Sequence, residues 1–454
     1  MTSETVRTQN NDLLDVRNLK TRFSTPEGLA HAVDGVSFRL RRGETYAIVG
    51  ESGCGKSVTA QSIMQILQKP AGFIAEGEIR LEDCDIVNLS EPRKRAIRGN
   101  RLAMIFQEPQ TSLNPVFTIG NQIAEVFRVH RHMTRRQIRE ESIELLNRVG
   151  LPDPEQRLQE YPHQLSGGMK QRVMIAMAIA CRPDVLIADE PTTALDVTIQ
   201  AQVLGLIDEL RKELNTAVLL ITHDLAVVRQ VADRVGVMYT GKLVETAPCA
   251  TLFEHPLHPY TRKLLQSIPS EMERGGRLSA IPGTVPSALH LPPGCTFADR
   301  CFAAQADCRQ VFPPLEEIEP QHNVACYHWT TRETPSSGPS KAPAEPQKER
   351  ETASLCIKNL KVYYPIRRGL LKRVVSHVHA VDGVSLELRP GKTTALVGES
   401  GCGKTTLGKA VMGLTAIREG TVHYGREDLA LARGKTLKSL RRQLQIVFQD
   451  PYAS

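Results

Sequence analysis

The chain has 454 residues, of which 41% are hydrophobic and 24% are charged, and its formal net charge is +7. These proportions are typical of globular domains and exclude a disordered or fibrous chain, and no apolar run approaches the about 18 residues that cross a bilayer. Residues 1–15 lack the basic start and apolar core of a secretory signal, and the modest charge is compatible with anionic ligands, an acidic membrane surface or an uneven solvated face.

Two nearly identical stretches show that the chain contains an internal repeat. HAVDGVSFRLRRGETYAIVGESGCGKS at 31–57 recurs as HAVDGVSLELRPGKTTALVGESGCGKT at 379–405. So long a period indicates two copies of a whole domain, and the proline- and serine-rich segment before the second copy is typical of a flexible tether. We expect a complete first domain over 13–250, an extension over 251–330, a linker over 331–354 and the N-terminal part of a second domain over 355–454.

A glycine-rich loop follows the predicted buried strand 46–50 and precedes a predicted helix. Glycines allow successive backbone N–H groups to turn toward phosphate oxygens at a helix N-terminus. In the pattern GxxxxGK[ST], Lys56 reaches the β and γ phosphates and the Ser57 hydroxyl binds Mg²⁺, and Lys404 and Thr405 repeat these roles. The predicted nucleotide-binding residues of the two loops are Gly50, Glu51, Ser52, Gly53, Cys54, Gly55, Lys56, Ser57 and Val58, and Gly398, Glu399, Ser400, Gly401, Cys402, Gly403, Lys404, Thr405 and Thr406.

Cys54 and Cys402 occupy variable positions inside these loops. We interpret them as small residues that fit; the alternative is a thiol whose pKa the positive loop lowers, which would make it reactive.

Three further segments carry polar residues where a nucleotide site needs them. VLIADE is a predicted buried strand that ends in Asp189 and Glu190, and alternation along a strand lets one carboxylate hold Mg²⁺ while the other polarises water. AVLLITHD brings His223 to the same sheet edge, where open α/β sheets bind ligands. In LSGGMKQR, Ser166 and two glycines precede a predicted helix, which forms a second N-terminus suited to phosphate.

The order of GESGCGKS, FQ, LSGGMKQR, VLIADEP, ALD and THD resembles the ATP-binding cassette (ABC) family over residues 13–246. The resemblance implies an α/β P-loop NTPase fold with an antiparallel β subdomain and a helical subdomain, followed here by a small cysteine-rich module and a partial second cassette. ATP and Mg²⁺ are the implied cofactors. The implied Mg²⁺ ligands are Ser57, Gln107, Asp189, Thr405 and Gln449.

The same resemblance implies roles for single residues. Glu190 would be the general base, His223 the γ-phosphate sensor, and Gln107 the link from Mg²⁺ and the attacking water to a transmembrane partner. Phe23 and Tyr364 match the aromatic residue that stacks on adenine, with a packed core aromatic as the alternative. The signature that contacts the γ-phosphate of an opposite cassette would be Ser166, Gly167, Gly168 and Gln171, with Asp196 at the dimer seam.

HPLHPYTRKLLQSIPS and the cysteine-rich segment after it resemble the C-terminal extension of peptide and nickel importer ATPases. With FQEPQTSLNP they resemble the dipeptide, oligopeptide and glutathione branch, including its tandem-cassette form. The resemblance implies an ATPase on the cytoplasmic face of the inner membrane, with two transmembrane permease subunits, a periplasmic or extracellular substrate-binding protein and a cassette–cassette dimer. The alternatives are a nickel or opine importer, or a soluble ABC ATPase acting on ribosomes or DNA; a proline-rich, neutral tether disfavours nucleic acid as a partner.

Four cysteines cluster in the extension, at Cys295, Cys301, Cys308 and Cys326. Four thiolates are the number that a [4Fe–4S] cluster or a structural Zn²⁺ requires, although the short C-x-x-C spacing of either is missing. Family resemblance favours iron–sulfur, and four reduced thiols packing a loop-rich module is the remaining interpretation.

The second copy contains its phosphate loop and Gln449 but stops at Ser454, before any SGG, carboxylate strand or switch histidine. We expect its sheet edge and half of its core to be exposed. We interpret the chain as the leading part of a tandem importer ATPase whose second portion folds poorly, so that activity would come from first domains pairing between chains.

Overall fold

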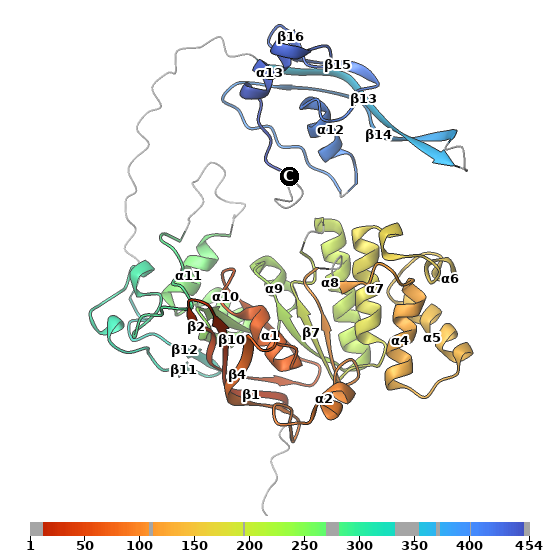
Figure 1. The fold of residues 1–454 in the computed structure, drawn as a ribbon. Helices are drawn as coiled ribbons and strands as arrows, with labels where there is room; N and C mark the ends of the chain where they lie inside the picture. Colours follow the sequence, from red (N-terminus) through yellow and green to blue (C-terminus); the bar gives the residue numbers. More distant parts are fainter. Residues whose placement is uncertain are drawn as a thin grey trace, which may run out of the picture. The chain divides into compact units, whose positions relative to one another are not determined.

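The computed structural model describes residues 12–108, 112–193, 196–268, 281–331, 354–368, 373–399 and 401–448 (Figure 1). The chain divides into two compact units, whose main parts are Met1–Leu195 with Ile199–Pro335, and Ser336–Ser454. Within the described ranges no helix combines the length and the apolar character needed to span a membrane. The predicted linker falls almost entirely outside the described residues.

The first unit begins with a four-stranded antiparallel sheet. Its strand order is β2-β1-β4-β5. In the second half of β2, Val36, Phe38 and Leu40 are buried while the intervening residues are exposed, which is the alternation of a sheet with one face on a core. The strands are β1 (Asp12–Thr25), β2 (Gly28–Arg41), β4 (Gly72–Leu81) and β5 (Cys84–Asp85).

An eight-stranded sheet in the order β11-β12-β10-β9-β3-β8-β7-β6 forms the centre of the first unit. The strands β9, β3, β8, β7 and β6, which lie side by side in this order, run parallel. Every residue of β3, β7 and β8 is buried, as expected for parallel strands covered on both faces. The strands are β3 (Thr45–Val49), β6 (Leu102–Ile105), β7 (Val185–Asp189), β8 (Ala217–Ile221), β9 (Arg234–Tyr239), β10 (Lys242–Pro248), β11 (Glu316–Glu319) and β12 (His322–Val324).

Two hydrophobic cores lie on opposite faces of this sheet. Tyr46 and Ile48 pack into the core shared with the antiparallel sheet, whereas Ala47 and Val49 pack into the core shared with the helices. The helices are α1 (Lys56–Met64), α2 (Glu91–Ile97), α4 (Ile119–His130), α5 (Arg135–Arg148), α6 (Pro154–Arg157), α7 (Gly167–Ile179), α8 (Val197–Leu214), α9 (Leu225–Val231), α10 (Cys249–Glu254) and α11 (Pro259–Gln266). The predicted buried strands and the helix after LSGG are therefore confirmed.

The C-terminal extension joins the central sheet. Strand β12 pairs antiparallel with β10, with Glu245 opposite Val324, and β11 pairs with β12. Two short 3₁₀ helices, η2 (Ala298–Arg300) and η3 (Asp307–Arg309), connect its loops. The sequence indicated a separate small module, but the structure places it in the same compact unit as the cassette.

The second unit contains one antiparallel sheet, in the order β14-β13-β15-β16. Its elements are β13 (Leu355–Arg368), β14 (Arg373–Leu388), α12 (Lys404–Val411), β15 (Glu419–Tyr424), β16 (Glu427–Asp428) and α13 (Gly434–Gln443). Residues 393–397, the counterpart of β3, form no strand, and Leu396 and Val397 are 50% and 86% exposed. Val447 near the end of the described chain is 97% exposed, so the predicted incomplete core is confirmed.

Candidate nucleotide site

The phosphate loop connects β3 to α1 and depends on glycine. Gly50, Gly53 and Gly55 have φ angles of 152°, 80° and 104°, which only glycine adopts without strain. A Cβ atom at Gly55 would come within 2.3 Å of the carbonyl oxygen of Ala32, and one at Gly50 within 2.1 Å of that of Met238. The loop therefore has no room for a side chain at Gly50 or Gly55.

Lys56, the first residue of α1, lies inside this loop and is only 5% exposed. Its Nζ donates hydrogen bonds to the carbonyl oxygens of Gly50 at 2.8 Å and of Glu51 at 3.0 Å. These two carbonyl oxygens are therefore the hydrogen-bond acceptors of the Lys56 ammonium group in this structure. Cys54 is buried, and burial raises the pKa of its thiol despite the neighbouring Lys56, which favours the interpretation of Cys54 as a small residue that fits.

Two predicted Mg²⁺ ligands meet next to the loop. The Ser57 hydroxyl donates to Oδ1 of Asp189 at 3.0 Å. Asp189 is 3% exposed, and burial together with the charge of Glu190 raises its pKa to about 6 although Ser57 opposes the shift. A buried carboxylate that pays a desolvation penalty gains strongly from a nearby cation, so the pair suits a hard divalent ion with oxygen ligands.

Glu190 is the point where the remaining predicted catalytic residues converge. Gln107 Nε2 donates to Glu190 Oε2 at 2.9 Å, and His223 Nδ1 lies 3.0 Å from Oε1. Thr193, which the sequence did not single out, donates its hydroxyl to Oε2 at 2.8 Å. Burial alone would raise the pKa of Glu190, but hydrogen bonds from His223 and Thr193 outweigh burial and lower it. The lowered pKa favours the charged carboxylate, and the contacts with Gln107, Thr193 and His223 hold its two oxygen atoms in one orientation.

The predicted signature divides into an exposed and a buried part. Ser166 caps α7, its hydroxyl accepts from Met169 N at 3.3 Å, and Ser166 and Gly167 are exposed. Gln171 is 1% exposed, and its Nε2 donates to the carbonyl oxygen of Pro191 at 2.6 Å. Gln171 therefore ties α7 to the segment after β7, and its assignment to the signature stays a prediction. Asp196 lies partly exposed just before α8.

The predicted adenine-stacking residues lie on equivalent strands of the two units. Phe23 on β1 is partly exposed, and its ring lies over Gly72, where a Cβ atom would come within 2.7 Å of Cε1. Tyr364 on β13 is 42% exposed. Ser400 and Gln449 lie outside the described residues.

The extension contributes two contacts to the phosphate loop that sequence reasoning missed. Arg300 binds both carboxylate oxygens of Glu51, at 2.6 and 2.9 Å. The Tyr260 hydroxyl accepts from the backbone N–H of Glu51 at 2.9 Å. The acidic residue inside an anion-binding loop was the signal that could have indicated a cationic partner.

All four predicted cysteines line one small cavity in the extension. Burial raises the pKa of Cys295 to about 11 and that of Cys326 to about 12, and the neighbouring thiols add to both shifts. Among described histidines, cysteines and acidic residues, three ligand atoms lie mutually within 4.8 Å, and they belong to Asp307, Cys308 and His328. A tetrahedral zinc site needs sulfurs about 3.8 Å apart, since Zn–S bonds are about 2.3 Å. Among the described residues, no three of the four thiols lie within 4.8 Å of one another.

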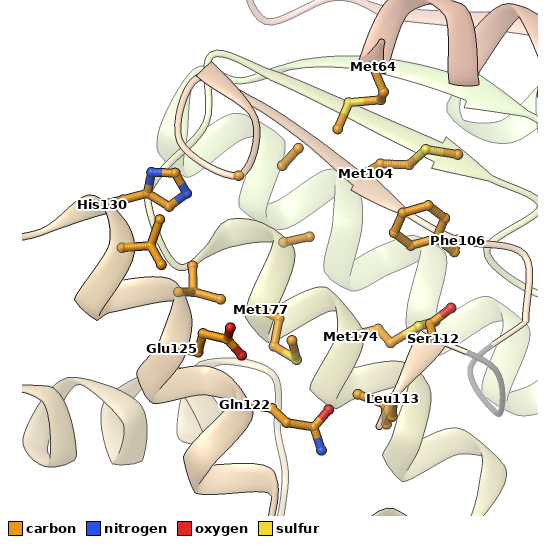
Figure 2. A pocket seen from close by; sticks show the side chains of 15 residues that line it. Met64, Met104, Phe106, Ser112, Leu113, Gln122, Glu125, His130, Met174 and Met177 are labelled. Atoms are coloured by element: carbon orange, nitrogen blue, oxygen red, sulfur yellow. The ribbon is translucent and has the colours of Figure 1, made fainter. Parts of the chain in front are cut away.

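An apolar groove lies beside Gln107. It measures about 350 Å³, and Phe106, the neighbour of Gln107, is among its lining residues. Figure 2 shows methionines directed into it, which adapt well to a partner surface. These are Met64, Met104, Met174 and Met177.

Comparison with known families gives the class of the protein. The family "ABC transporter" matches residues 33–193 and 381–454, and the family "Oligopeptide/dipeptide transporter, C-terminal region" matches residues 244–308. The chain belongs to the ABC transporter family, and its first unit has the α/β fold of an ABC P-loop NTPase.

Individual relatives make the comparison more specific. The chain is 43% identical over 97% of its length to the "Glutathione import ATP-binding protein GsiA" of Pectobacterium atrosepticum, and it covers 64% of that protein. It is 52% identical to the "Probable peptide ABC transporter ATP-binding protein y4tR" of Sinorhizobium fredii, over 69% of this chain and 94% of that protein. The chain thus spans less than two thirds of the GsiA relatives. Among solved structures, the ADP- and phosphate-bound dimer of the ATP-binding cassette MJ0796 matches 52% of this chain and 98% of its own, with 26% identity and a TM-score of 0.48.

Proposed function

We propose that the first unit binds Mg·ATP at its phosphate loop and hydrolyses it. The observation that carries the proposal is the convergence of Gln107, Thr193 and His223 on Glu190, next to the Ser57–Asp189 pair. Lys56 would bind the β and γ phosphates, and Ser57, Asp189 and Gln107 would hold Mg²⁺, which supplies charge neutralisation when bound.

Phosphoryl transfer needs positioning and charge stabilisation more than covalent chemistry. A Glu190 carboxylate kept charged can orient an attacking water and accept its proton as general base. His223, whose side chain is largely exposed and whose Nδ1 contacts Glu190, would sense the γ-phosphate. Phe23 would stack on adenine, and the backbone N–H groups of residues 52–58 would bind phosphate oxygens.

A second cassette would complete the site. Ser166 and the two following glycines form an exposed helix N-terminus, which suits the γ-phosphate held by an opposite cassette, with Asp196 at the seam. We propose that first units of two chains pair, so that turnover per chain increases with protein concentration. Turnover that is independent of concentration over a range spanning the pairing would contradict this.

The physiological role that we propose is to energise import of a peptide-type solute, with glutathione, dipeptide and oligopeptide as candidates. The printed names of the relatives and the match to the oligopeptide/dipeptide region support it. Two permease subunits and a substrate-binding protein would be the partners, with the apolar groove beside Gln107 receiving the permease at the cytoplasmic face of the inner membrane. A nickel or opine importer of the same branch is the alternative, and competition for uptake by each solute distinguishes them.

We further propose that Cys295, Cys301, Cys308 and Cys326 hold a [4Fe–4S] cluster, with Zn²⁺ as the alternative. Four thiols lining one buried cavity support a metal centre, because a cation would stabilise thiolates that burial alone disfavours. Metal analysis and visible absorption of anaerobically purified protein test this. Cys295→Ser should lower the bound iron, whereas Cys84→Ser, outside the cavity, should not; a colourless, zinc-free protein excludes the centre.

The hydrolysis proposal is tested by Glu190→Gln. Loss of the general base should reduce ATP turnover by about 10²–10⁴-fold while ATP binding persists. The matched control is Glu140→Gln on the exposed face of α5, where the carboxylate only pairs with Arg136. Wild-type turnover in Glu190→Gln would refute the assignment.

A further inference from the structure

One residue of the phosphate loop is held from outside the cassette. Glu51 makes three contacts that fix its amide, its carbonyl and its carboxylate separately. Its N–H donates a hydrogen bond to the hydroxyl of Tyr260, and its carbonyl oxygen accepts one from Lys56. Its carboxylate accepts hydrogen bonds from both Nη atoms of Arg300. Tyr260 and Arg300 belong to the C-terminal extension.

Arg300 is itself held rigidly. Its side chain is 6% exposed, and its Nε donates to the carbonyl oxygen of Pro282 at 2.9 Å. Nη1 also donates to the hydroxyl of Tyr239 at 3.1 Å, and the guanidinium lies 5.8 and 5.9 Å from the ring centroids of Tyr239 and Phe297. A planar, two-pronged contact with a carboxylate is geometrically specific, and a buried arginine without its carboxylate is costly.

Tyr260 is equally well fixed. It is fully buried, and its ring centroid lies 4.7 Å from that of Tyr239 and 5.3 Å from that of Phe297. The start of its helix is anchored because the buried carboxylate of Glu245 on β10 accepts from the N–H groups of Leu257 and His258. The hydroxyl is therefore delivered to the loop by an element tied to the central sheet.

The consequence concerns the loop before nucleotide arrives. The carbonyl oxygens of Gly50 and Glu51 hold Lys56 in place, so the position of Glu51 decides where the ammonium waits. A binding loop that is fixed in its competent shape loses less conformational entropy on binding, and its affinity is higher.

We propose that Arg300 and Tyr260 are positioning residues for the phosphate loop, through which the C-terminal extension sets the affinity for nucleoside triphosphate. The proposal rests on the nucleotide-binding function proposed above. Arg300 directly precedes Cys301, so whatever fixes the cysteine segment also fixes this clamp.

The second unit offers an internal reference. Its loop has the same sequence, GESGCGK, and Lys404 likewise donates to the carbonyl oxygens of Gly398 and Glu399, both at 2.6 Å. Cys54 is 1% exposed in the first loop, whereas Cys402 is exposed in the second. The reactivity of the buried Cys54 can therefore be followed without nucleotide against an exposed cysteine at the same place in the repeat.

The test uses the full chain with Arg300→Gln, Glu51→Gln and the double variant. We measure the dissociation constant of Mg·ATPγS by calorimetry and the alkylation rate of Cys54 by peptide mass spectrometry, with Cys402 as reference. Each single variant should weaken binding about tenfold, and the double variant also about tenfold rather than about 100-fold, since the two side chains act as one pair. Cys54 should react about tenfold faster in all three.

Further variants exclude general destabilisation. Arg309→Gln breaks the exposed Arg309–Asp299 pair in the same extension and should leave both readouts at wild-type values. Arg300→Lys should retain part of the affinity, because lysine keeps the charge but not the two-pronged geometry. Should Arg300→Gln fail to fold, Tyr260→Phe removes only a hydroxyl and should still weaken binding about threefold.

Two results would overturn the proposal: nucleotide affinity within about twofold of wild type in folded Arg300→Gln and Tyr260→Phe, or additive effects in the double variant. Lys56→Ala separates this from the underlying function. If Lys56→Ala weakens binding about 10- to 100-fold and the clamp variants do not weaken it, only the positioning role fails. If wild-type protein binds no Mg·ATPγS, the proposed function fails, and the alkylation rates alone decide whether the clamp holds the loop.

Discussion

The two phosphate loops of this chain share their sequence but not their surroundings. In the first unit, β3 is fully buried between β8 and β9. In the second, the equivalent residues form no strand, and Val397 is 86% exposed. Yet both loops have the same local shape: Gly55 and Gly403 have φ angles of 104° and 100°, and each is followed by a helix that begins at the lysine.

This difference separates local from long-range causes. The glycines determine the turn within a few residues, since Gly55 and Gly403 adopt positive φ angles that side-chain-bearing residues rarely adopt without strain. Burial of the strand, in contrast, needs neighbouring strands, and within the described residues the second unit provides none for 393–397. A phosphate-loop motif therefore predicts a turn, and only the complete sheet makes it a site.

Hydrogen exchange should show the largest contrast. The amides of Tyr46–Ile48, which pair with both β8 and β9, should exchange at least about 10³-fold more slowly than those of 394–396, because buried ladder hydrogen bonds open only with large-scale unfolding. Exchange measured by mass spectrometry on the full chain resolves both segments. Similar protection in both, or a stable proteolytic product spanning 355–454, would show that the second unit completes its core by other means.

Lys56→Ala against Lys404→Ala gives the next contrast. Removing a charge-assisted contact to phosphate should weaken Mg·ATP binding about 10- to 100-fold in the first loop. The second loop lies outside a formed sheet, so Lys404→Ala should change the total affinity less than about twofold. Titration calorimetry on each variant measures both. An equal loss from Lys404→Ala would mean that the second loop binds nucleotide on its own.

A smaller contrast concerns Asp34 and its repeat partner Asp382. Asp34 binds Arg22 at 2.6 Å and Lys242 at 2.7 Å, and these bonds outweigh burial and lower its pKa to about 2. Asp382 is exposed, and its carboxylate accepts from the hydroxyl of Tyr363 at 2.6 Å. Asp34→Asn should therefore lower the free energy of unfolding of the first unit by about 1 kcal/mol at pH 7, and Asp382→Asn should have no measurable effect.

The sign of the pH dependence follows from the lowered pKa. A carboxylate with a folded pKa below its unfolded value stabilises the protein above about pH 4 and loses that contribution as pH falls toward 2. The difference between wild type and Asp34→Asn in urea unfolding should stay constant from pH 7 to 5 and shrink below about pH 4. A difference that grows on acidification would contradict the ion-pair explanation.

The sequence predicted much of the cassette. The contacts of the extension that it could not predict have a physical reason in common, because they depend on how distant segments fold together. Lys56, Ser57, Asp189, Glu190 and His223 lie in motifs at fixed places along strands and loops, so their convergence follows from a parallel sheet. The contacts of Arg300 and Tyr260 with Glu51 depend on how the extension folds back, which no local pattern encodes. No local pattern encodes the hydrogen bond from Thr193 to Glu190 either. Gln171 was assigned to the signature from its motif, and a motif does not show that its side chain is buried.

Strand β12 has a practical consequence for anyone shortening this protein. It covers the edge of β10, and Nε2 of its first residue, His322, lies 2.7 Å from Oε1 of the buried Glu245. A truncated cassette ending near residue 250 would present a bare strand as a template for intermolecular pairing and would leave that carboxylate without its main hydrogen-bond donors. A shortened version that keeps this pairing must therefore extend past β12, and versions that end near residue 250 should aggregate.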